Sequence, residues 1–311
     1  MDRRTFLAAA AALGPGLRTM ADGPPRPPSR AGTRLILLGT AGGPRPRPTR
    51  AASAQVIVAN DSAYVVDCGN GVARQMAMAR VPLPSIRNVF ITHHHSDHNA
   101  DYGTLLLLAW SSGLATPIDT WGPPPLAHIT ETFFDMSATD IDARMRDEGR
   151  VDPRPLVRPH ELRTGGPIVE DGNLKVTAAL VDHPPMSFAF AYRFDAPDRS
   201  IVISGDTRRS DTLIALARGA DILVHEAMLA DAVDRLIVDV PNAPDLKRSI
   251  LSHHTTAEDA GRVAQSAGVR TLVLSHLVPA EDPGVSDEMW IEAARRHFSG
   301  SVIVGRDLLE I

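Results

Sequence analysis

The stretch Thr92–Asp101, Thr-His-His-His-Ser-Asp-His-Asn-Ala-Asp, decides the fold of this chain. It overlaps the end of the apolar run Asn88–Thr92, which is typical of a buried β-strand. Because side chains two residues apart on an extended segment share a face, His93 and His95 can bind one cation, and the donors that follow the turn can face a second. The four candidate ligands in this stretch are His93, His95, Asp97 and His98. Their position directly after a strand disfavours the alternative of a solvated histidine-rich loop.

Composition is that of an ordinary soluble enzyme. Of the 311 residues, 43% are hydrophobic and 22% are charged, which excludes a largely disordered chain. The formal net charge of −5 argues against a broad surface for nucleic-acid phosphates. The single cysteine, Cys68, excludes a disulfide within the chain and a metal site built from cysteines. Any metal ligands must therefore be histidines and carboxylates.

Residues 1–21 have the pattern of an export signal. Arg3 and Arg4 precede an apolar run too short to span a bilayer, and the pattern resembles the twin-arginine signal that exports folded proteins. The Pro-rich residues 22–33 then read as a linker, which disfavours an N-terminal helix of a cytosolic enzyme. We expect a periplasmic or secreted protein that engages the twin-arginine export machinery. No later stretch reaches eighteen consecutive apolar residues, so no stable membrane span is expected.

Strand and helix patterns alternate along residues 34–311, which form one predicted domain with an α/β layered fold. Thr255 and Glu258 have the spacing of a capping box at the start of a helix that Gly268 ends. The stretch 123–166 is predicted to be an insertion or a lid, because prolines interrupt its helical pattern. The predicted strands are 34–38, 54–59, 63–66, 88–92, 157–163, 174–181, 188–194, 200–204, 221–225 and 271–275, and the other predicted helices are 71–80 and 212–218.

The pattern His-x-His-x-Asp-His after a strand ending in Thr resembles the signature of the metallo-β-lactamase superfamily. Flanking segments look like its ribonuclease Z and arylsulfatase branch, and they occur in that branch's order. These segments are 65–76, 89–106, 121–126, 203–207, 220–227 and 254–276. The resemblance implies a four-layered αβ/βα sandwich with two metal ions at one edge of the sheets. It also makes a homodimer an expectation, although no apolar stripe marks an interface.

Carried over residue by residue, the resemblance implies seven metal ligands. His93, His95 and His183 would hold the first ion, and the second would be held by Asp97, His98 and His276. Asp206 would bridge both ions. Each of the last three in chain order, His183, Asp206 and His276, also follows or ends an apolar strand pattern, where a polar side chain can project from a sheet edge. Since related di-iron proteins tend to carry Glu at the place of His95, the histidine favours zinc and hydrolysis, with iron or manganese left open.

Two cations lower the pKa of a bridging water, and the resulting hydroxide is the expected nucleophile. Asp97 can orient that hydroxide, and His254, charged or oriented by Glu226, is the candidate proton donor to the leaving oxygen. The alternatives are that Glu226 is a buried structural acceptor and that the helix start requires Thr255 rather than its neighbour. His94, His225 and His253 are expected to be structural or to support the ligands.

Three features of the sequence disfavour a ribonuclease Z-type activity on transfer RNA. The export signal separates the protein from RNA, the short segment 184–205 lacks a long RNA-binding arm, and Leu-Val-Pro-Ala-Glu-Asp follows His276 in place of the usual continuation. A Lys-rich strip is also absent from the sequence.

We therefore predict an exported hydrolase of small esters, arylsulfatase-like or phosphodiesterase-like, for which nucleic acid is not expected as a partner. Lactone or phosphotriester hydrolysis on the same metals is the alternative enzymatic interpretation. A periplasmic zinc-binding protein without catalysis is the alternative outside enzymes.

Overall fold

Two β-sheets packed face to face form the centre of the computed structural model, which describes residues 32–238, 240 and 242–311. The first sheet has the order β1-β2-β3-β4-β5-β6 and the second the order β13-β12-β11-β10-β9-β8-β7. The strands of the first sheet are β1 (Arg34–Gly39), β2 (Ala54–Ala59), β3 (Ser62–Val66), β4 (Ile86–Phe90), β5 (Ile118–Gly122) and β6 (Val157–Glu161). Those of the second are β7 (Gly166–Glu170), β8 (Lys175–Val181), β9 (Ala189–Asp195), β10 (Ser200–Ile203), β11 (Ile222–Met228), β12 (Thr271–Val278) and β13 (Ser301–Val304).

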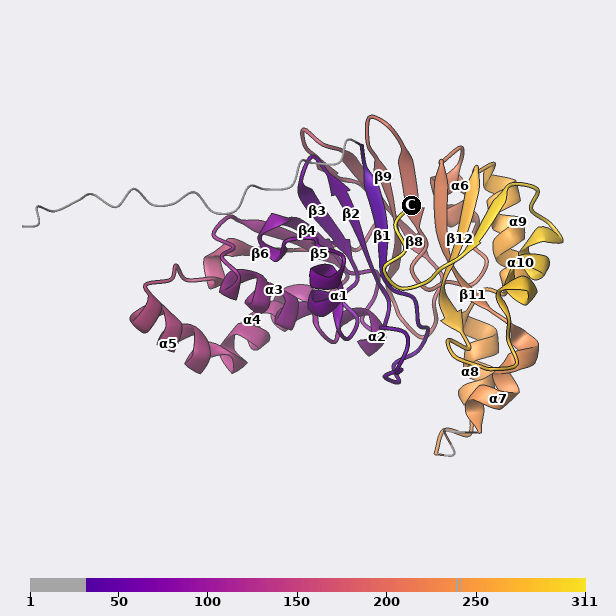
Figure 1. Ribbon diagram of the computed structural model, residues 1–311, viewed down its shortest axis with the longest axis horizontal. Helices are drawn as coiled ribbons and strands as arrows, with labels where there is room; N and C mark the ends of the chain where they lie inside the picture. The colour runs from indigo at the N-terminus through magenta and orange to yellow at the C-terminus, as the bar shows by residue number, and fades with distance from the viewer. Residues whose placement is uncertain (1–31, 239, 241) are drawn as a thin grey trace, which may run out of the picture. The chain divides into compact units, whose positions relative to one another are not determined.

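Helices cover the outer face of each sheet, so the four-layered αβ/βα sandwich predicted from the sequence is confirmed (Figure 1). On the first sheet lie α1 (Val72–Met78), α3 (Tyr102–Ser111) and α4 (Leu126–Met136), followed by α5 (Ala138–Glu148). On the second lie α6 (Asp211–Ala217), α9 (Ala257–Ala267) and α10 (Asp287–Arg295). The shorter helices are α2 (Ser96–Asn99), α7 (Val233–Ile237), α8 (Leu246–His253) and the 3₁₀ turns η1 (Leu83–Ser85), η2 (Arg154–Leu156) and η3 (Ala230–Ala232).

Strand β1 shows why the predicted strands read as continuous apolar runs. Its residues alternate between two clusters: Leu35 and Leu37 pack between the sheets, whereas Ile36 and Leu38 pack under the helices of the first sheet. Because both faces of the strand are buried, both sets of side chains must be apolar. The layer between the sheets is aromatic at its centre, where the ring centroid of Phe90 lies 5.3 Å from that of Tyr192.

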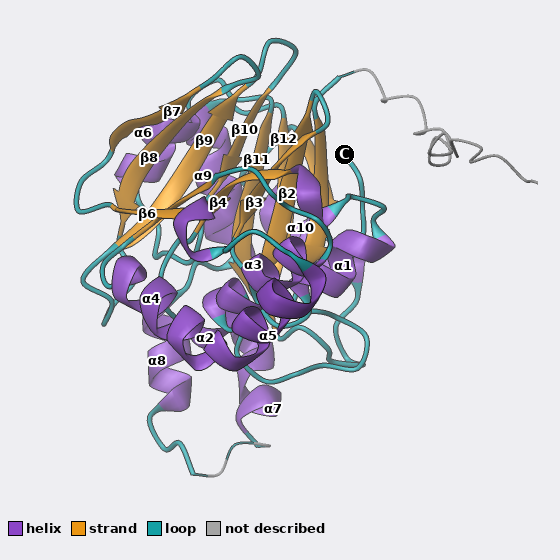
Figure 2. Cartoon of the chain, turned by 90° about the vertical axis from the view of Figure 1, so that its left-hand side faces the viewer, coloured by secondary structure: helices purple, strands orange, loops and turns teal. Residues whose placement is uncertain are grey.

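The parallel strands place the polar residues that follow them at one edge of the molecule. Strands β3 to β6 run parallel in the first sheet and β10 to β13 in the second. Figures 1 and 2 both show α2, α7 and α8 at this same edge, below the sheets. Binding sites of α/β sheets form outside the carboxyl ends of the strands.

The predicted capping box of α9 is displaced by one residue. Thr256, not Thr255, caps the helix: its Oγ1 accepts a hydrogen bond from the Asp259 amide at 3.1 Å. The hydroxyl of Thr255 instead donates to the Thr207 carbonyl at 2.5 Å. The predicted end is confirmed, since Gly268 adopts the left-handed conformation with φ 65°.

The stretch 123–166 contributes the edge strand β6 to the first sheet and the helices α4 and α5 to the helical layer that covers it. Strand β6 pairs in parallel with β5, and α4 packs on β6. Its role as a lid stays a prediction. The predicted signal at residues 1–21, and all of the predicted linker 22–33 except its last two residues, lie outside the described residues. None of the described helices combines the length and the apolar character needed to cross a bilayer.

Candidate metal centre

The ends of strands from both sheets bring the predicted ligands together. The connection after β4 carries His93 and His95 and leads into α2, whose first turn holds Asp97 and His98. His183 follows β8 and Asp206 follows β10, whereas the last ligand lies within β12. All seven predicted ligands therefore meet at the sheet edge, and they are His93, His95, Asp97, His98, His183, Asp206 and His276.

His276 reaches the cluster through a β-bulge. Pairing between β11 and β12 shifts register at this point: Glu226 pairs with Ser275 and Ala227 with Leu277, which leaves His276 unpaired. The residue has a φ of 44°, an uncommon conformation for a residue with a side chain. Bulges of this kind re-aim a side chain next to functional sites.

The first group of donor atoms consists of three imidazole nitrogens and one carboxylate oxygen. Nδ1 of His95 lies 2.9 Å from Nε2 of His93 and 3.1 Å from Nε2 of His183. Oδ2 of Asp206 lies 3.8 Å from Nε2 of both His93 and His183. Three imidazoles and one carboxylate are a donor set that Zn²⁺ accepts.

A second group shares the same aspartate. Nε2 of His98 lies 3.3 Å from Oδ1 of Asp206 and 3.6 Å from Oδ2 of Asp97. Nε2 of His276 lies 3.2 Å from Oδ2 of Asp97 and 3.3 Å from Oδ2 of Asp206. Because Asp206 contributes its two oxygens to both groups, it can bridge two cations, as the sequence predicts.

Two buried atoms of the second group fit a cation better than any protein partner. In the described part of the chain, Nε2 of His98 and Oδ1 of Asp206 face each other at 3.3 Å but form no hydrogen bond with each other or with another group, although both residues are buried. Buried polar atoms of this kind are rare unless an ion or a water satisfies them. The residues present therefore fit divalent cations, and the site is a divalent-metal centre.

The protonation states of the first group suit metal binding. Burial lowers the pKa of His93 well below its usual range and that of His183 to about 4, so both imidazoles are neutral at neutral pH. Burial raises the pKa of Asp206, but the charges of His276 and His98 outweigh this effect and lower it well below its usual range. Neutral imidazole and ionised carboxylate are the forms that bind a metal ion.

Asp67 orients one of the ligands, and the sequence prediction missed it. Nδ1 of His98 donates to Oδ2 of Asp67 at 2.7 Å, which leaves Nε2 of the same ring for a cation. The Thr92 amide donates to Oδ1 of Asp67 at 2.8 Å and thereby holds the carboxylate in place. The available signal was a carboxylate placed directly after the buried strand β3.

The predicted catalytic pair forms beside the donor atoms. Nδ1 of His254 lies 2.8 Å from Oε2 of the buried Glu226 and 3.8 Å from Oδ2 of Asp206. The Thr207 amide donates to Oε1 of Glu226 at 2.6 Å. Burial lowers the pKa of His254, but the carboxylate of Glu226 more than offsets this and raises it to about 9.

The three histidines that the sequence analysis expects to be structural or to support the ligands contact such partners. His94 Nε2 donates to the Pro123 carbonyl at 2.8 Å and His225 Nδ1 to the Glu226 carbonyl at 2.8 Å. The carbonyl of His253 accepts a hydrogen bond from Nδ1 of His183 at 3.1 Å, which leaves Nε2 of His183 for the first donor group.

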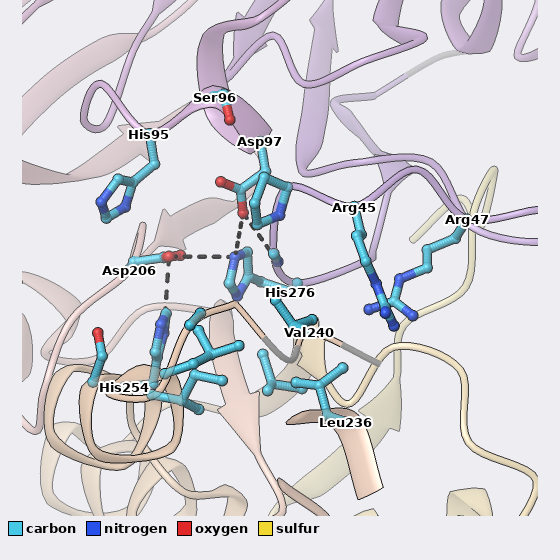
Figure 3. Close-up of a pocket in the computed structure, with 18 residues that line it drawn as sticks. Arg45, Arg47, His95, Ser96, Asp97, Asp206, Leu236, Val240, His254 and His276 are labelled. Atoms are coloured by element: carbon cyan, nitrogen blue, oxygen red, sulfur yellow. Dashed lines mark hydrogen bonds and ion pairs between the residues drawn. The ribbon is translucent and has the colours of Figure 1, made fainter. Parts of the chain in front are cut away.

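A cavity of about 340 Å³, here called the site cavity, opens onto the donor atoms. Figure 3 shows His95, Asp97, Asp206, His254 and His276 on one side of it. Other labelled side chains come from the β1–β2 connection and from the α7–α8 region, and they are Arg45, Arg47, Leu236 and Val240. Among the described residues that line the cavity, none belongs to 123–166.

Comparison with known proteins places the chain in a family. A family model described as a β-lactamase superfamily domain matches residues 63–277. Ribonuclease Z of Mycobacterium bovis (strain BCG / Pasteur 1173P2) is 34% identical over 277 residues, which cover 88% of this chain and 96% of that protein. Among solved structures, the short form of human tRNase Z aligns with a TM-score of 0.66 at 22% identity, covering 89% of this chain and 98% of that one. The metallo-β-lactamase fold protein YhfI of Bacillus subtilis aligns with a TM-score of 0.65 at 21% identity, covering 90% and 98%.

The similarity to ribonuclease Z corrects the predicted function and partners. The sequence prediction of a hydrolase of small esters, with nucleic acid not expected as a partner, is wrong, because relatives over nearly the whole chain are ribonucleases. A short segment 184–205 removes one means of holding RNA but leaves the metal centre complete. Counting lysines was also misleading, since the positive charges at the site cavity are the arginines Arg45 and Arg47.

The fold, the two groups of donor atoms and the sequence similarity all indicate the same protein family. The chain is a metal-dependent hydrolase, and it belongs to the metallo-β-lactamase superfamily as a member of its ribonuclease Z family.

Proposed function

We propose that this protein is an endoribonuclease that uses two zinc ions to hydrolyse a phosphodiester bond in a structured RNA such as a transfer-RNA precursor. The observation that carries the proposal is the position of Asp206, whose two oxygens face two separate groups of donor atoms. The names of the relatives support RNA as the substrate. The predicted non-catalytic zinc-binding protein is disfavoured, because a hydrogen-bonded pair of acid and histidine lies beside the donor atoms.

The seven proposed ligands fall into two groups that share Asp206. His93, His95 and His183 would hold one ion. Asp97, His98 and His276 would hold the other, and Asp206 would contact both. Cations bound there supply Lewis acidity, which lowers the pKa of the attacking water and offsets the charge of the phosphodiester.

Asp97 is placed to orient the attacking water as well as to bind metal. Its Oδ2 accepts hydrogen bonds from the Gly43 amide at 3.0 Å and faces Nε2 of His276 at 3.2 Å. The carboxylate is therefore held rigidly at the floor of the site cavity. Rigid placement of a base within reach of the water is what general base catalysis requires.

His254 is the proton donor to the leaving oxygen, and Glu226 keeps it protonated. The side chain of His254 is 15% exposed, so the ring reaches the site cavity while its Nδ1 faces Glu226. With Nδ1 bound to the carboxylate, Nε2 is the nitrogen free to give a proton. Glu226 touches no substrate in this proposal and acts as a positioning residue.

Three measurements on purified protein test the proposal. Elemental analysis is expected to give two zinc ions per chain, and the protein is expected to cleave a transfer-RNA precursor in a reaction that a chelator abolishes and zinc restores. The variant His254→Ala is expected to lose about 10²–10⁴-fold in kcat with unchanged metal content. Full metal occupancy with the RNA left intact would contradict the proposal, and an active His254→Ala variant would remove the assignment of the proton donor.

Export through a twin-arginine signal stays a proposal beside this one. Its support is the Arg3-Arg4 pair before a short apolar run, in residues outside the described part of the chain. Export would separate the protein from transfer-RNA precursors in the cytoplasm, so the two proposals are tested separately, RNA cleavage with purified protein and export by cell fractionation.

A further inference from the structure

A second, much smaller cavity lies on the buried side of the metal centre, and we call it the inner cavity. Its volume is about 10 Å³, and every residue that lines it is buried. The first sheet contributes Gln55 of β2, and the second sheet contributes Ser275 and His276 of β12. These three residues are 3%, 2% and 4% exposed, respectively. The inner cavity therefore lies between the two halves of the sandwich, away from bulk solvent.

Each of these three side chains has a buried polar atom that finds no hydrogen-bond partner in the described part of the chain. The atoms are Oε1 of Gln55, Oγ of Ser275 and Nδ1 of His276. A buried donor or acceptor without a partner destabilises the fold, so such atoms are rare and are normally satisfied by an ordered guest. Because all three residues line one cavity, a single hydrogen-bonding guest can satisfy all three atoms.

The imidazole of His276 differs from other proposed ligands in how its second nitrogen is held. Nδ1 of His98 donates to Oδ2 of Asp67 at 2.7 Å, and Nδ1 of His183 donates to the His253 carbonyl at 3.1 Å. His276 turns Nε2 toward the carboxylates of the centre, as Figure 3 shows. A histidine that binds metal almost always donates its other N–H to a carboxylate, a carbonyl or a water. For His276, the side that faces the inner cavity is where such an acceptor belongs.

We propose that the inner cavity binds one water molecule, which orients His276 for the metal. The water accepts hydrogen bonds from Nδ1–H of His276 and from the hydroxyl of Ser275, and it donates one to Oε1 of Gln55. Three hydrogen bonds are typical of a buried water, and about 10 Å³ is the smallest space that holds one. The inference rests on the proposed function, because His276 is a ligand only if the centre binds metal.

The bound water gives Gln55 and Ser275 a role as positioning residues. With the proton of His276 held on Nδ1, the lone pair of Nε2 is left for a cation. His276 belongs to the second group of donor atoms and not to the group of His93, His95 and His183. Loss of the water is therefore expected to weaken one metal position and to spare the other.

A crystal structure of the zinc-loaded protein tests the water directly. We expect one ordered water within about 3.2 Å of Oε1 of Gln55, Oγ of Ser275 and Nδ1 of His276. A zinc-loaded structure that shows no such water would overturn the inference.

Gln55→Leu removes the acceptor for the water without adding charge. Zinc titration is expected to show a loss of about 10–100-fold in affinity at one metal position, the usual effect of removing support from a metal-bound histidine. Gln75→Leu is the matched control, since Gln75 is also buried but lies on α1, donates to the Leu38 carbonyl and does not line the inner cavity. The control is expected to lose stability and to keep both zinc affinities. Equal zinc affinities in Gln55→Leu and its control would overturn the role of Gln55.

Ser275→Val fills the inner cavity with methyl groups in place of the hydroxyl and the water. We expect its zinc-loaded structure to lack the water and its second zinc affinity to fall as in Gln55→Leu. Because both substitutions act through one water, the double variant should bind zinc no more weakly than the weaker of the two single variants. Losses that add in the double variant would contradict a shared water.

The outcomes separate the inference from the proposed function. If the protein binds two zinc ions and cleaves RNA, but the variants keep their zinc affinities, the water site is overturned while the ribonuclease proposal stands. If the unsubstituted protein binds zinc and leaves RNA intact, the proposed function fails and the water site is still judged by the structure and the titrations. Unfolding midpoints of the metal-free variants, measured by circular dichroism, identify any loss that is due to misfolding.

Discussion

Nε2 of His276 lies 3.2 Å from Oδ2 of Asp97, although 179 positions separate the two residues in the chain. One comes from the second sheet and the other from the helix after β4 in the first sheet. The metal centre therefore joins the two halves of the sandwich. Asp206 also links the two halves, because it faces His98 of the first half and His276 of the second.

Asp206→Asn is expected to empty the centre of metal. An amide lacks the negative charge that two neighbouring cations require, so affinity at both positions falls together. Elemental analysis after dialysis should show less than half of the metal content of the unsubstituted protein. Asp147→Asn, an exposed change on α5 with the same loss of charge, should retain full content. Loss of only one ion would show that Asp206 does not bridge.

Asp67→Asn is expected to weaken one metal position and spare the other. Its Oδ2 accepts the hydrogen bond from Nδ1 of His98, a ligand of the second group only. Loss of such a supporting carboxylate costs about 10–100-fold in metal affinity. Titration with zinc should give two distinguishable affinities, of which one falls. Equal weakening of both would indicate a general loss of structure rather than a role in orienting His98.

The residues that the sequence analysis named as ligands meet in the fold, and they could be named because their signals are local. His183, Asp206 and His276 each end or follow an apolar strand pattern. They meet at one sheet edge because β8, β10 and β12 run in the same direction. The capping residue of α9 was predicted one position early, because two adjacent threonines give the same local signal and only the structure shows which of them accepts from the Asp259 amide.

Features that depend on tertiary contacts were missed. Asp67 supports His98 across 31 residues, and the apolar cluster around Val233, Ile250 and Val278 forms only when α7 and α8 pack against β12. The dependence on tertiary contacts also explains why the substrate predicted from the sequence was wrong. Composition shows few lysines, but it does not show that Arg45 and Arg47 lie beside the donor atoms.

The buried His225 makes the free energy of unfolding depend on pH. Burial lowers its pKa to about 4, so the folded protein keeps the ring neutral between pH 6.5 and 4 while the unfolded chain takes up a proton there. The neutral ring's contribution to the free energy of unfolding is therefore complete above pH 6.5. It is lost as the pH falls toward 4, and the total loss is about 3 kcal/mol. We expect His225→Gln to lose less stability than the unsubstituted protein between pH 7 and pH 4 in denaturant titrations. Parallel curves for the two proteins would contradict this.

Replacement of Arg3 and Arg4 by lysine is expected to retain the protein in the cytoplasm. The twin-arginine pathway recognises the paired arginines, so the conservative change should block export while leaving the catalytic domain unaltered. Cell fractionation and immunoblotting of both forms measure the distribution. Arg18→Lys lies in the same predicted signal but outside the pair, and it should leave the distribution unchanged. Retention of all three forms in the cytoplasm would contradict the predicted export.

Glu226→Gln is expected to move the alkaline limb of the pH–rate profile to lower pH. The carboxylate of Glu226 lies 2.8 Å from Nδ1 of His254 and is the main group that raises the pKa of that ring. Activity requires the protonated ring, so it is lost as the pH rises through the pKa of His254. The amide keeps the size of the side chain and can still accept from the Thr207 amide, but it removes the charge. A lower pKa means that the proton is lost at a lower pH.

The direction of this shift holds with or without metal ions, because it compares two proteins that share the same ligands. kcat measured from pH 6 to 10 should therefore fall earlier in Glu226→Gln, with equal zinc content in the two samples. A lower kcat with an unmoved limb would show that Glu226 only supports the fold. In that case, the proton donor would have to be sought elsewhere than at His254.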